Sequence, residues 1–296
     1  MSRQNAAWWF LAPALIVLGL FFLLPVIAAL LLSLTDYDLY ALADVRNLRF
    51  VALANYWDLL HRPLFWSALG HTFYFVIVGV PLSIATSLGA ALLLNSPLAR
   101  FKPFFRTALF APVVTTVVAV AVIWRYLFNT KYGWANYGLS SLGIDPIDWL
   151  GDPHWAMPTI ILFAVWKNFG YNMIIFLAGL QAIPADLYEA ARIDGASVPS
   201  QFRHITLPML APTLLMVSIL TVSGYFQLFA EPYVMTQGGP ADATNVLQFY
   251  GYKKTFAEGM IGYGSAIAVT VFLMSLVLSL VYLRAFKTSR LEGTPQ

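Results

Sequence analysis

The sequence predicts an all-α membrane protein with six transmembrane helices, on the evidence of its composition and its long apolar runs. Hydrophobic residues fill 59% of the 296 positions and charged residues only 10%, whereas soluble domains carry about 25% charged residues. A helix needs about 20 apolar residues to span a bilayer. Six runs meet this need, at residues 9–34, 68–94, 105–128, 157–180, 212–234 and 263–286.

The first run follows a short segment whose only cation is Arg3, as in a signal peptide. Its apolar length is too great for a signal peptide and no convincing cleavage site follows it, so we expect a retained span. An excess of Lys and Arg marks cytoplasmic segments. With the N-terminus inside, the inner segments hold nine Lys or Arg residues against four acids. We therefore expect both termini to be cytoplasmic.

The spans group into three parts of the chain. Residues 1–67 form an N-terminal span with an external loop, residues 68–286 hold the other five spans, and residues 287–296 form a cytoplasmic tail.

A polar insert, "EAARIDGASVPSQFRHITLP" (residues 189–208), separates the fourth and fifth runs. Pro184 suits a helix start, and Gly195 suits the position after a helix end. Ser197 can cap a second short helix, which Pro208 would end. The insert is therefore expected to form two short helices around a glycine turn, on the cytoplasmic side.

The first of these short helices carries a small apolar stripe formed by Leu187, Ala190 and Ala191, at helical spacing. Glu189, Arg192 and Asp194 place charges at its edge. A linker resting on lipid headgroups would be rich in lysine and bulky anchors, and this insert has neither. The pattern favours docking to a partner protein over a lipid-resting linker.

The insert also contains Glu-Ala-Ala, three residues, Gly, nine residues and Ile-x-Leu-Pro. This pattern resembles the cytoplasmic EAA signature of permease subunits of bacterial ABC importers. Segments such as "MTQGGPADAT" and "GYGSAIAV" extend the resemblance to carbohydrate-uptake permeases, specifically the maltose-type first permease subunit.

The resemblance implies a type I ABC importer transmembrane domain over residues 68–286, with a coupling loop at 183–209 and an EAA coupling helix. That helix would sit in a cleft of a cytoplasmic ATPase subunit, with Glu189 paired to a basic residue and the Gly195 turn as a pivot. The residues expected to couple to the ATPase are Glu189, Ala190, Ala191, Asp194, Gly195, Ile205, Leu207 and Pro208.

The resemblance further implies a passive pathway subunit in a bacterial inner membrane. Its expected partners are a second homologous permease, two copies of the ATPase subunit, an external solute-binding protein, membrane lipid and a sugar. ATP and Mg would be used by the ATPase, and no cofactor is expected in this chain.

The sequence lacks the common motifs for ATP binding, metal-dependent and serine hydrolysis, and nucleic-acid binding. There is no P-loop, no H-E-x-x-H, no G-x-S-x-G elbow and no cysteine. Basic patches interleaved with aromatic residues are also missing. We therefore expect no catalysis, no metal site and no nucleic-acid partner.

Polar residues within the fourth and fifth runs are candidates for the substrate pathway, because polar groups in a membrane usually face a bundle interior or a wet cavity. Amides and hydroxyls among aromatic rings suit a sugar. The alternative is hydrogen bonding between helices, which fits Asn168 and Asn172, whereas Lys167 and Gln227 fit a cavity better. The candidate set is Lys167, Asn168, Tyr171, Asn172, Ser223, Tyr225, Phe226 and Gln227.

Ser223, Gln227 and Glu231 recur every four residues in the fifth run, which places them on one face of a continuous helix. Glu231 lies near the outer end of this run, so we expect a solvated interfacial role for it.

The segment "TQGGPADAT" is rich in turn-forming residues and is expected to be an external loop. The family resemblance places binding-protein contacts in such loops, here at Gly238, Gly239 and Pro240. A simple connector is the alternative.

Two other functions remain open. A self-sufficient secondary transporter would need intramembrane carboxylates for ion coupling, and the nearest acid to a span is Glu231. An ABC permease for glycerol-3-phosphate or another polar solute is the nearer alternative. A phosphate-bearing substrate calls for more cations than Lys167 alone, which favours a neutral sugar.

Overall fold

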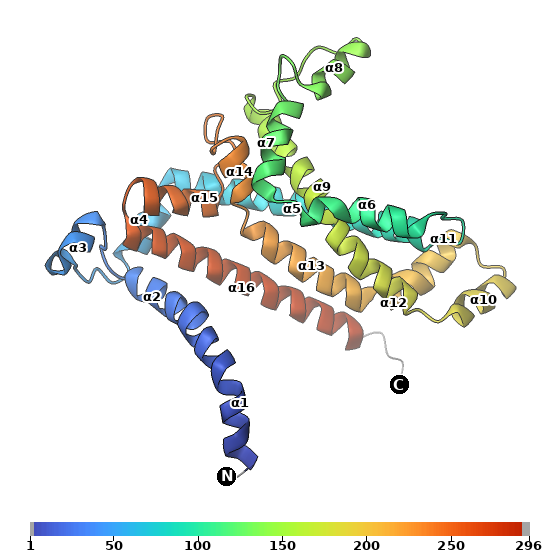
Figure 1. Cartoon of the computed structure of the whole chain (residues 1–296), viewed down its shortest axis with the longest axis horizontal. Coiled ribbons are helices and arrows are strands. Elements are labelled where there is room, and N and C mark those ends of the chain that lie inside the picture. The colour runs from blue at the N-terminus through green and yellow to red at the C-terminus, as the bar shows by residue number, and fades with distance from the viewer. Residues whose placement is uncertain (1–2, 292–296) are drawn as a thin grey trace. The chain divides into compact units, whose positions relative to one another are not determined.

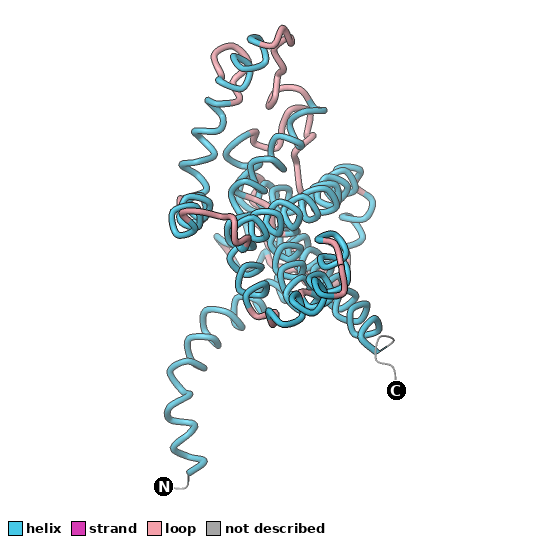
Figure 2. The backbone as a smooth tube through the Cα atoms, turned by 90° about the vertical axis from the view of Figure 1, so that its right-hand side faces the viewer, coloured by secondary structure: helices cyan, strands magenta, loops and turns pink. Residues whose placement is uncertain are grey.

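The computed structural model describes residues 3–291, without side-chain detail for residues 3–9, 42, 45, 282 and 285–291. Within these residues the chain is helical (Figure 2), and a single isolated β-bridge joins Thr35 to Phe50. The chain divides into two compact units, Met1–Ser67 with Leu247–Met274 and Ala68–Val246 with Ser275–Gln296. The end of the predicted tail, residues 292–296, lies outside the described residues.

The first unit holds short helices and the start of two long ones (Figure 1). Its elements are α1 (Arg3–Leu18), a π-helical turn (Gly19–Leu23), α2 (Leu24–Leu32), α3 (Leu39–Ala43), a 3₁₀ turn (Val45–Asn47), α4 (Ala54–His61), α15 (Leu247–Tyr252), a π-helical turn (Lys253–Ala257), and the first residues of α5 (Pro63–Asn95) and of α16 (Ile261–Leu291).

The second unit holds the rest of α5 and α16 and all the helices between residues 102 and 235. These helices are α6 (Lys102–Val114), α7 (Val117–Leu127), α8 (Trp134–Ser141), α9 (Pro153–Gln181), α10 (Ala185–Ile193), α11 (Val198–Gln201), α12 (Leu207–Met209), α13 (Ala211–Phe226) and α14 (Ala230–Met235), with a π-helical turn (Phe202–Thr206) between α11 and α12.

Four helical segments of the described chain are long and apolar enough to cross a membrane: Phe10–Leu32, Pro63–Asn95, Pro153–Gln181 and Ile261–Val281. The first segment stays helical through Pro25 because the turn before the proline is a wider π-helical turn. Because Pro25 has no N–H to donate, the preceding turn Gly19–Leu23 is π-helical, and the Leu24 N–H reaches back to the Gly19 carbonyl.

The third and fifth predicted runs fall in bent pairs of helices rather than in single long helices. The third span bends by 98° between Lys102–Val114 and Val117–Leu127. Thr115 and Thr116 are extended at this break. Residues 113–118 are all β-branched and follow Pro112, and both features disfavour a continued helix.

The fifth predicted span, residues 212–234, also breaks, because α13 ends at Phe226 rather than at residue 234. A separate bend of 67° lies just before this span, between Val198–Met209 and Ala211–Phe226. In a continuous helix the ring of Pro232 would clash with the carbonyl of Leu228. The chain instead restarts as α14, with Pro232 in its first turn. Ser223, Gln227 and Glu231 therefore do not share one helical face.

The core of the second unit is built around α9, whose buried residues run from Ala156 to Leu180. Gly170 of α9 faces the backbone of α6 so closely that a Cβ there would lie 2.4 Å from the Leu109 carbonyl oxygen. This close packing brings the end of α6 against the middle of α9.

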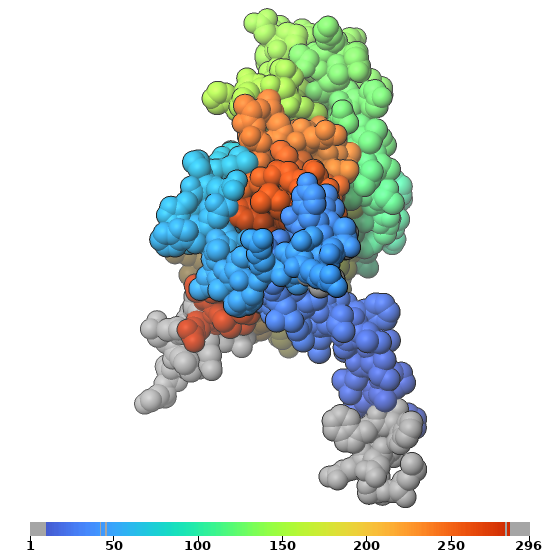
Figure 3. Space-filling model, turned by 90° about the vertical axis from the view of Figure 1, so that its left-hand side faces the viewer, coloured from blue at the N-terminus to red at the C-terminus, as the bar shows by residue number. Residues whose placement is uncertain are grey.

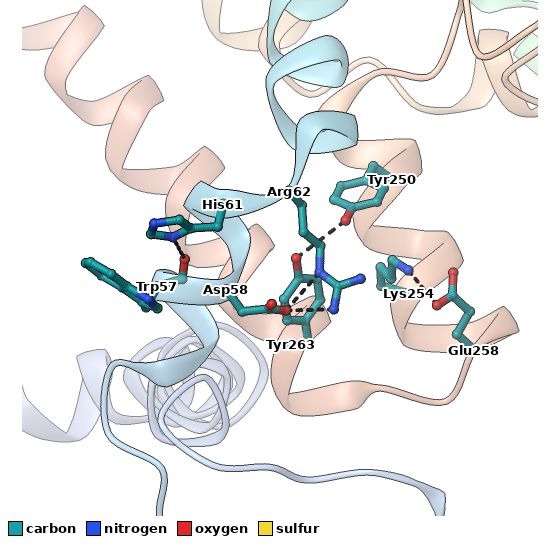
Figure 4. A network of polar contacts seen from close by, with 8 residues as sticks. All are labelled: Trp57, Asp58, His61, Arg62, Tyr250, Lys254, Glu258 and Tyr263. Carbon is teal, nitrogen blue, oxygen red and sulfur yellow. Dashed lines mark hydrogen bonds and ion pairs between the residues drawn. The ribbon is translucent and has the colours of Figure 1, made fainter.

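The first unit is tied together by an aromatic and ionic group that we call the Arg62 cluster: Asp58, Arg62, Tyr250, Lys254, Glu258 and Tyr263 (Figure 4). Arg62 pairs with Asp58 at 2.8 Å and lies over the Tyr263 ring. The Asp58 hydrogen bond raises the pKa of Arg62. The Tyr263 hydroxyl meets that of Tyr250, whose ring also faces Lys254. The space-filling view shows the surface of the α4 region beside that of the α15 region (Figure 3).

Candidate functional site

A cavity of about 430 Å³ opens in the second unit, among the end of α6, α9, α13 and the start of α14. Its volume lies within the range of about 300–1,000 Å³ typical of small-molecule sites. Five of the candidate pathway residues line it: Asn168, Tyr171, Asn172, Tyr225 and Gln227.

The end of α13 shapes one wall of this cavity. Because the helix stops at Phe226, residues 227–229 turn away from the α13 axis, and the side chains of Gln227, Leu228 and Phe229 line the cavity together. Gln227 is exposed. The helix break thus supplies an amide group beside apolar and aromatic surface.

Asn172 is buried at the junction of three helices. Its Nδ2 donates to Thr221 Oγ1 of α13 at 2.9 Å and to Ser83 Oγ of α5 at 3.4 Å. Asn168 donates to the Ala164 carbonyl of its own helix at 3.0 Å. Both residues line the cavity and also make these bonds, so hydrogen bonding between helices and cavity lining coexist at Asn172.

Lys167 is buried beside the cavity but does not line it. Its Nζ donates to the Val113 carbonyl at 3.1 Å. In a continuous helix that carbonyl would accept from the Val117 N–H, and the break between α6 and α7 leaves it free. A cation at a helix C-terminus is also favourable for the helix dipole. Lys167 therefore caps α6, and a pathway role for it stays a prediction.

Two other candidates lie away from the cavity. Phe226 is fully buried and packs edge-on against Phe73, with ring centroids 5.4 Å apart. Ser223 is half-buried and does not line the cavity.

Sequence reasoning missed Glu231 as a cavity residue. The structure places it in the cavity wall and half-buried, not at a solvated interface. Hydropathy alone extends the fifth run past residue 226, but Pro232 was the available signal, because it forces the helix to restart near residue 230.

The polar insert forms α10 and α11 around Gly195, as the sequence predicts. The second helix continues through the π-helical turn and α12 to Met209, so Pro208 does not end it, and Ser197 starts it without a side-chain capping bond. Gly195 has φ +75°. The Gly195 N–H donates to the Arg192 carbonyl at 3.1 Å and the Ala196 N–H to the Ala191 carbonyl at 2.8 Å, which is the Schellman pattern of helix ends. Gln201 Nε2 then donates to the Ala196 carbonyl and fixes the start of the second helix.

One side of the insert packs on the core and the other stays open. Tyr188 and Ile205 pack against the buried cluster that includes Leu180 and Leu210, and the Tyr188 and Thr206 hydroxyls meet at 2.9 Å. The other coupling candidates lie elsewhere. Glu189, Ala190, Asp194, Gly195, Leu207 and Pro208 are exposed, and Ala191 is half-buried. Figure 1 shows α10 beyond the carboxyl end of α9.

The loop after α14 is closely bonded to itself. The Thr244 hydroxyl meets that of Thr236 at 2.7 Å and donates to the Gly239 carbonyl at 2.7 Å. Gly238 is buried and Gly239 and Pro240 are half-buried, whereas Gln237, Ala241 and Asp242 are exposed. A protein that met this loop would touch the exposed residues rather than Gly238.

The sequence model of a transport family, described as "Binding-protein-dependent transport system inner membrane component", matches residues 79–289. The chain belongs to this family. It is 36% identical to the probable ABC transporter permease protein YurN of Bacillus subtilis, over 99% of this chain and 100% of that protein.

Two further relatives have saccharides in their names. The chain is 38% identical to the lactose transport system permease protein LacF of Rhizobium radiobacter, covering 92% of this chain and 91% of that protein. It is 36% identical to the trehalose/maltose transport system permease protein MalF of Thermococcus litoralis, covering 94% and 92%.

A solved structure has the same fold. A bacterial ABC transporter involved in the import of the acidic polysaccharide alginate contains a chain that superposes with a TM-score of 0.81 at 21% identity, covering 97% of this chain and 96% of that one. The family match makes this chain an inner membrane component of a binding-protein-dependent transport system, and the superposition shows a shared fold.

Proposed function

We propose that the chain forms the translocation pathway of an ATP-driven importer for a sugar or oligosaccharide delivered by an external binding protein. The cavity is the observation that carries this proposal. Its wall combines amides (Asn168, Asn172, Gln227) with the aromatic rings of Tyr171 and Tyr225, and this combination suits the hydroxyls and apolar ring faces of a sugar. Relatives named for lactose and for trehalose and maltose support the same substrate class.

Glycerol-3-phosphate is the weaker candidate. A phosphate needs several cationic donors, and the described residues of the cavity wall include no Lys or Arg. The ammonium of Lys167 is engaged by the Val113 carbonyl. A neutral polyhydroxyl substrate therefore fits this cavity better.

The proposed topology has six spans in the bacterial inner membrane, with both termini in the cytoplasm. Four are the long apolar helices, and the two bent pairs supply the others. Re-entrant or broken helices are tolerated at membrane depth where they line a cavity. The break after Val114 and the end of α13 at Phe226 both lie next to residues of the cavity wall.

The proposed coupling element is α10, which would dock into a cytoplasmic ATPase subunit that holds ATP and Mg. Its apolar residues Leu187, Ala190 and Ile193 are exposed. Glu189 is also exposed and would pair with a basic residue of the ATPase. The assembly would contain a second homologous permease, two ATPase copies and the binding protein. The binding protein would contact the loop after α14.

Substitutions in the insert test this function. Gly195→Val places a Cβ at φ +75° and should cost about 1–2 kcal/mol locally, re-aiming α11. Glu189→Lys should replace attraction at the ATPase by repulsion. Both variants are expected to insert and assemble, yet ATP hydrolysis by the reconstituted complex should no longer rise when loaded binding protein is added.

Gly143→Val is the matched control. Gly143 has the same φ of +75° with nothing within 4 Å of the added Cβ, but it lies in the α8 region rather than in the insert. It should show the same loss of stability and keep the stimulated ATPase activity. Full stimulation in both Gly195→Val and Glu189→Lys would show that the insert is only a linker.

A further inference from the structure

Glu231 is the one acidic or basic residue in the described wall of the cavity. The rest of the wall consists of apolar, amide, hydroxyl and phenol side chains and one glycine, Gly224. A ligand in this cavity would therefore meet a single carboxylate.

The carboxylate has no ion-pair partner among the described residues of the chain. It interacts with its own backbone N–H, and the cation that acts on it is Lys167. That ammonium is held at 3.1 Å by the Val113 carbonyl. Arg125 of α7 donates to the Val234 carbonyl of α14 at 3.3 Å. Both nearby cations thus have backbone partners, and neither lines the cavity.

A half-buried carboxylate that has no ion-pair partner keeps lone pairs that can accept hydrogen bonds from a ligand. Sugar hydroxyls donate such bonds, and Gln227 and Asn168 on the same wall complete the set. An anionic sugar brings a second negative charge into a cavity of low polarity, where like charges repel much more strongly than in water.

We propose that Glu231 is a specificity-determining residue that selects neutral saccharides and excludes those carrying carboxylate or phosphate groups. The inference rests on the proposed function, because it assumes that saccharides pass through this cavity. It adds to the proposed pathway a charge filter, by which we mean discrimination between neutral and anionic saccharides by the Glu231 carboxylate. The restart of the chain at α14 places Glu231 in the cavity wall.

The test measures saccharide binding by the complete importer, purified without its binding protein, from the shift of its thermal unfolding midpoint. The probes are maltotriose and arabinotriose, which are neutral, and trigalacturonate, which is anionic. Wild type should be stabilised by a neutral probe and not by trigalacturonate. Glu231→Gln should bind trigalacturonate about tenfold more tightly than wild type, a modest effect for like charges at an effective dielectric constant of about 20.

Two further variants keep the result interpretable. Glu231→Asp retains the charge and should still exclude trigalacturonate. Glu258→Gln removes an acid that pairs with Lys254 and does not line the cavity, and it should bind the probes as wild type does. A change in Glu258→Gln equal to that in Glu231→Gln would overturn the charge filter.

The remaining outcomes separate the two proposals. If a neutral probe binds but Glu231→Gln excludes trigalacturonate as wild type does, the role of Glu231 is wrong and the sugar pathway stands. If no saccharide shifts the midpoint of any variant, the proposed function fails and this inference fails with it.

Discussion

The Arg62 cluster and the cavity are both rich in polar groups, but they differ in where those groups find partners. In the Arg62 cluster each charge is paired within the protein: Asp58 with Arg62 and Lys254 with Glu258. The aromatic rings of Tyr250 and Tyr263 lie between the two pairs (Figure 4). In the cavity, Gln227 and Glu231 face open volume.

This difference separates polar groups that bond to other protein groups from polar groups that face a cavity and, on the proposed function, bind the substrate. A polar side chain with a protein partner contributes to stability, and its removal leaves that partner unsatisfied. A polar side chain that faces a cavity contributes little to stability, so its removal should affect function alone. Lys167 and Asn172 are the instructive intermediates, because they lie at the cavity but have protein partners.

The largest effect on stability is expected for Lys167→Met. The change frees the Val113 carbonyl at the end of α6, and a hydrogen bond to a charged group contributes about 1.5–3 kcal/mol. The unfolding midpoint of the purified complex should fall together with the yield of assembled subunits. Lys131→Met, at an exposed lysine, is the control and should leave both unchanged. Normal assembly with lost uptake would instead place Lys167 in the substrate pathway.

A smaller effect on stability distinguishes Asn172→Leu from Gln227→Leu, although both residues line the cavity. Asn172→Leu removes the bond to Thr221, and such bonds between membrane helices contribute about 0.6 kcal/mol on average, up to about 1.7. It should lower both the unfolding midpoint and uptake. Gln227→Leu should lower uptake, while the free energy of unfolding stays within about 0.5 kcal/mol of the wild-type value. Equal losses of stability would mean that Gln227 also supports the fold.

The sequence was sufficient wherever local chemistry decides the structure. Gly195 lies just after a run of helix-forming residues, and only a residue tolerant of positive φ fits there. The turn and its two helices were therefore predictable from a short segment. Four of the six long apolar runs likewise correspond to long helical segments in the structure.

The sequence was not sufficient at the two broken spans. Hydropathy is insensitive to β-branching and to a single proline, so the 98° break after Val114 and the restart at α14 were both missed. Each miss changed the expected surroundings of a residue at or beside the cavity. The first break creates the free Val113 carbonyl that Lys167 caps, and the second turns Glu231 into the cavity. Pro232 was a local signal for the restart at α14. The bond between Lys167 and the Val113 carbonyl and the place of Glu231 in the cavity wall depend on tertiary packing.

The smallest effect on uptake is expected for Arg62→Met in the Arg62 cluster. The Asp58 pair is about half exposed, with side-chain exposures of 42% and 49%, and exposed pairs contribute about 0.2–1 kcal/mol. The contact with the Tyr263 ring adds about 0.5–1 kcal/mol. Because Asp58 raises the already high pKa of Arg62, the stabilisation by this pair is complete at neutral pH and would be lost only at strongly alkaline pH.

Thermal unfolding of Arg62→Met should show a loss of about 1 kcal/mol in the free energy of unfolding. This loss should be constant between pH 6 and 9. Arg46→Met, at an exposed arginine, is the control. Uptake should remain near wild type, since a paired charge in this cluster serves the fold. A large loss of uptake without a change in the midpoint would contradict the distinction between the two regions.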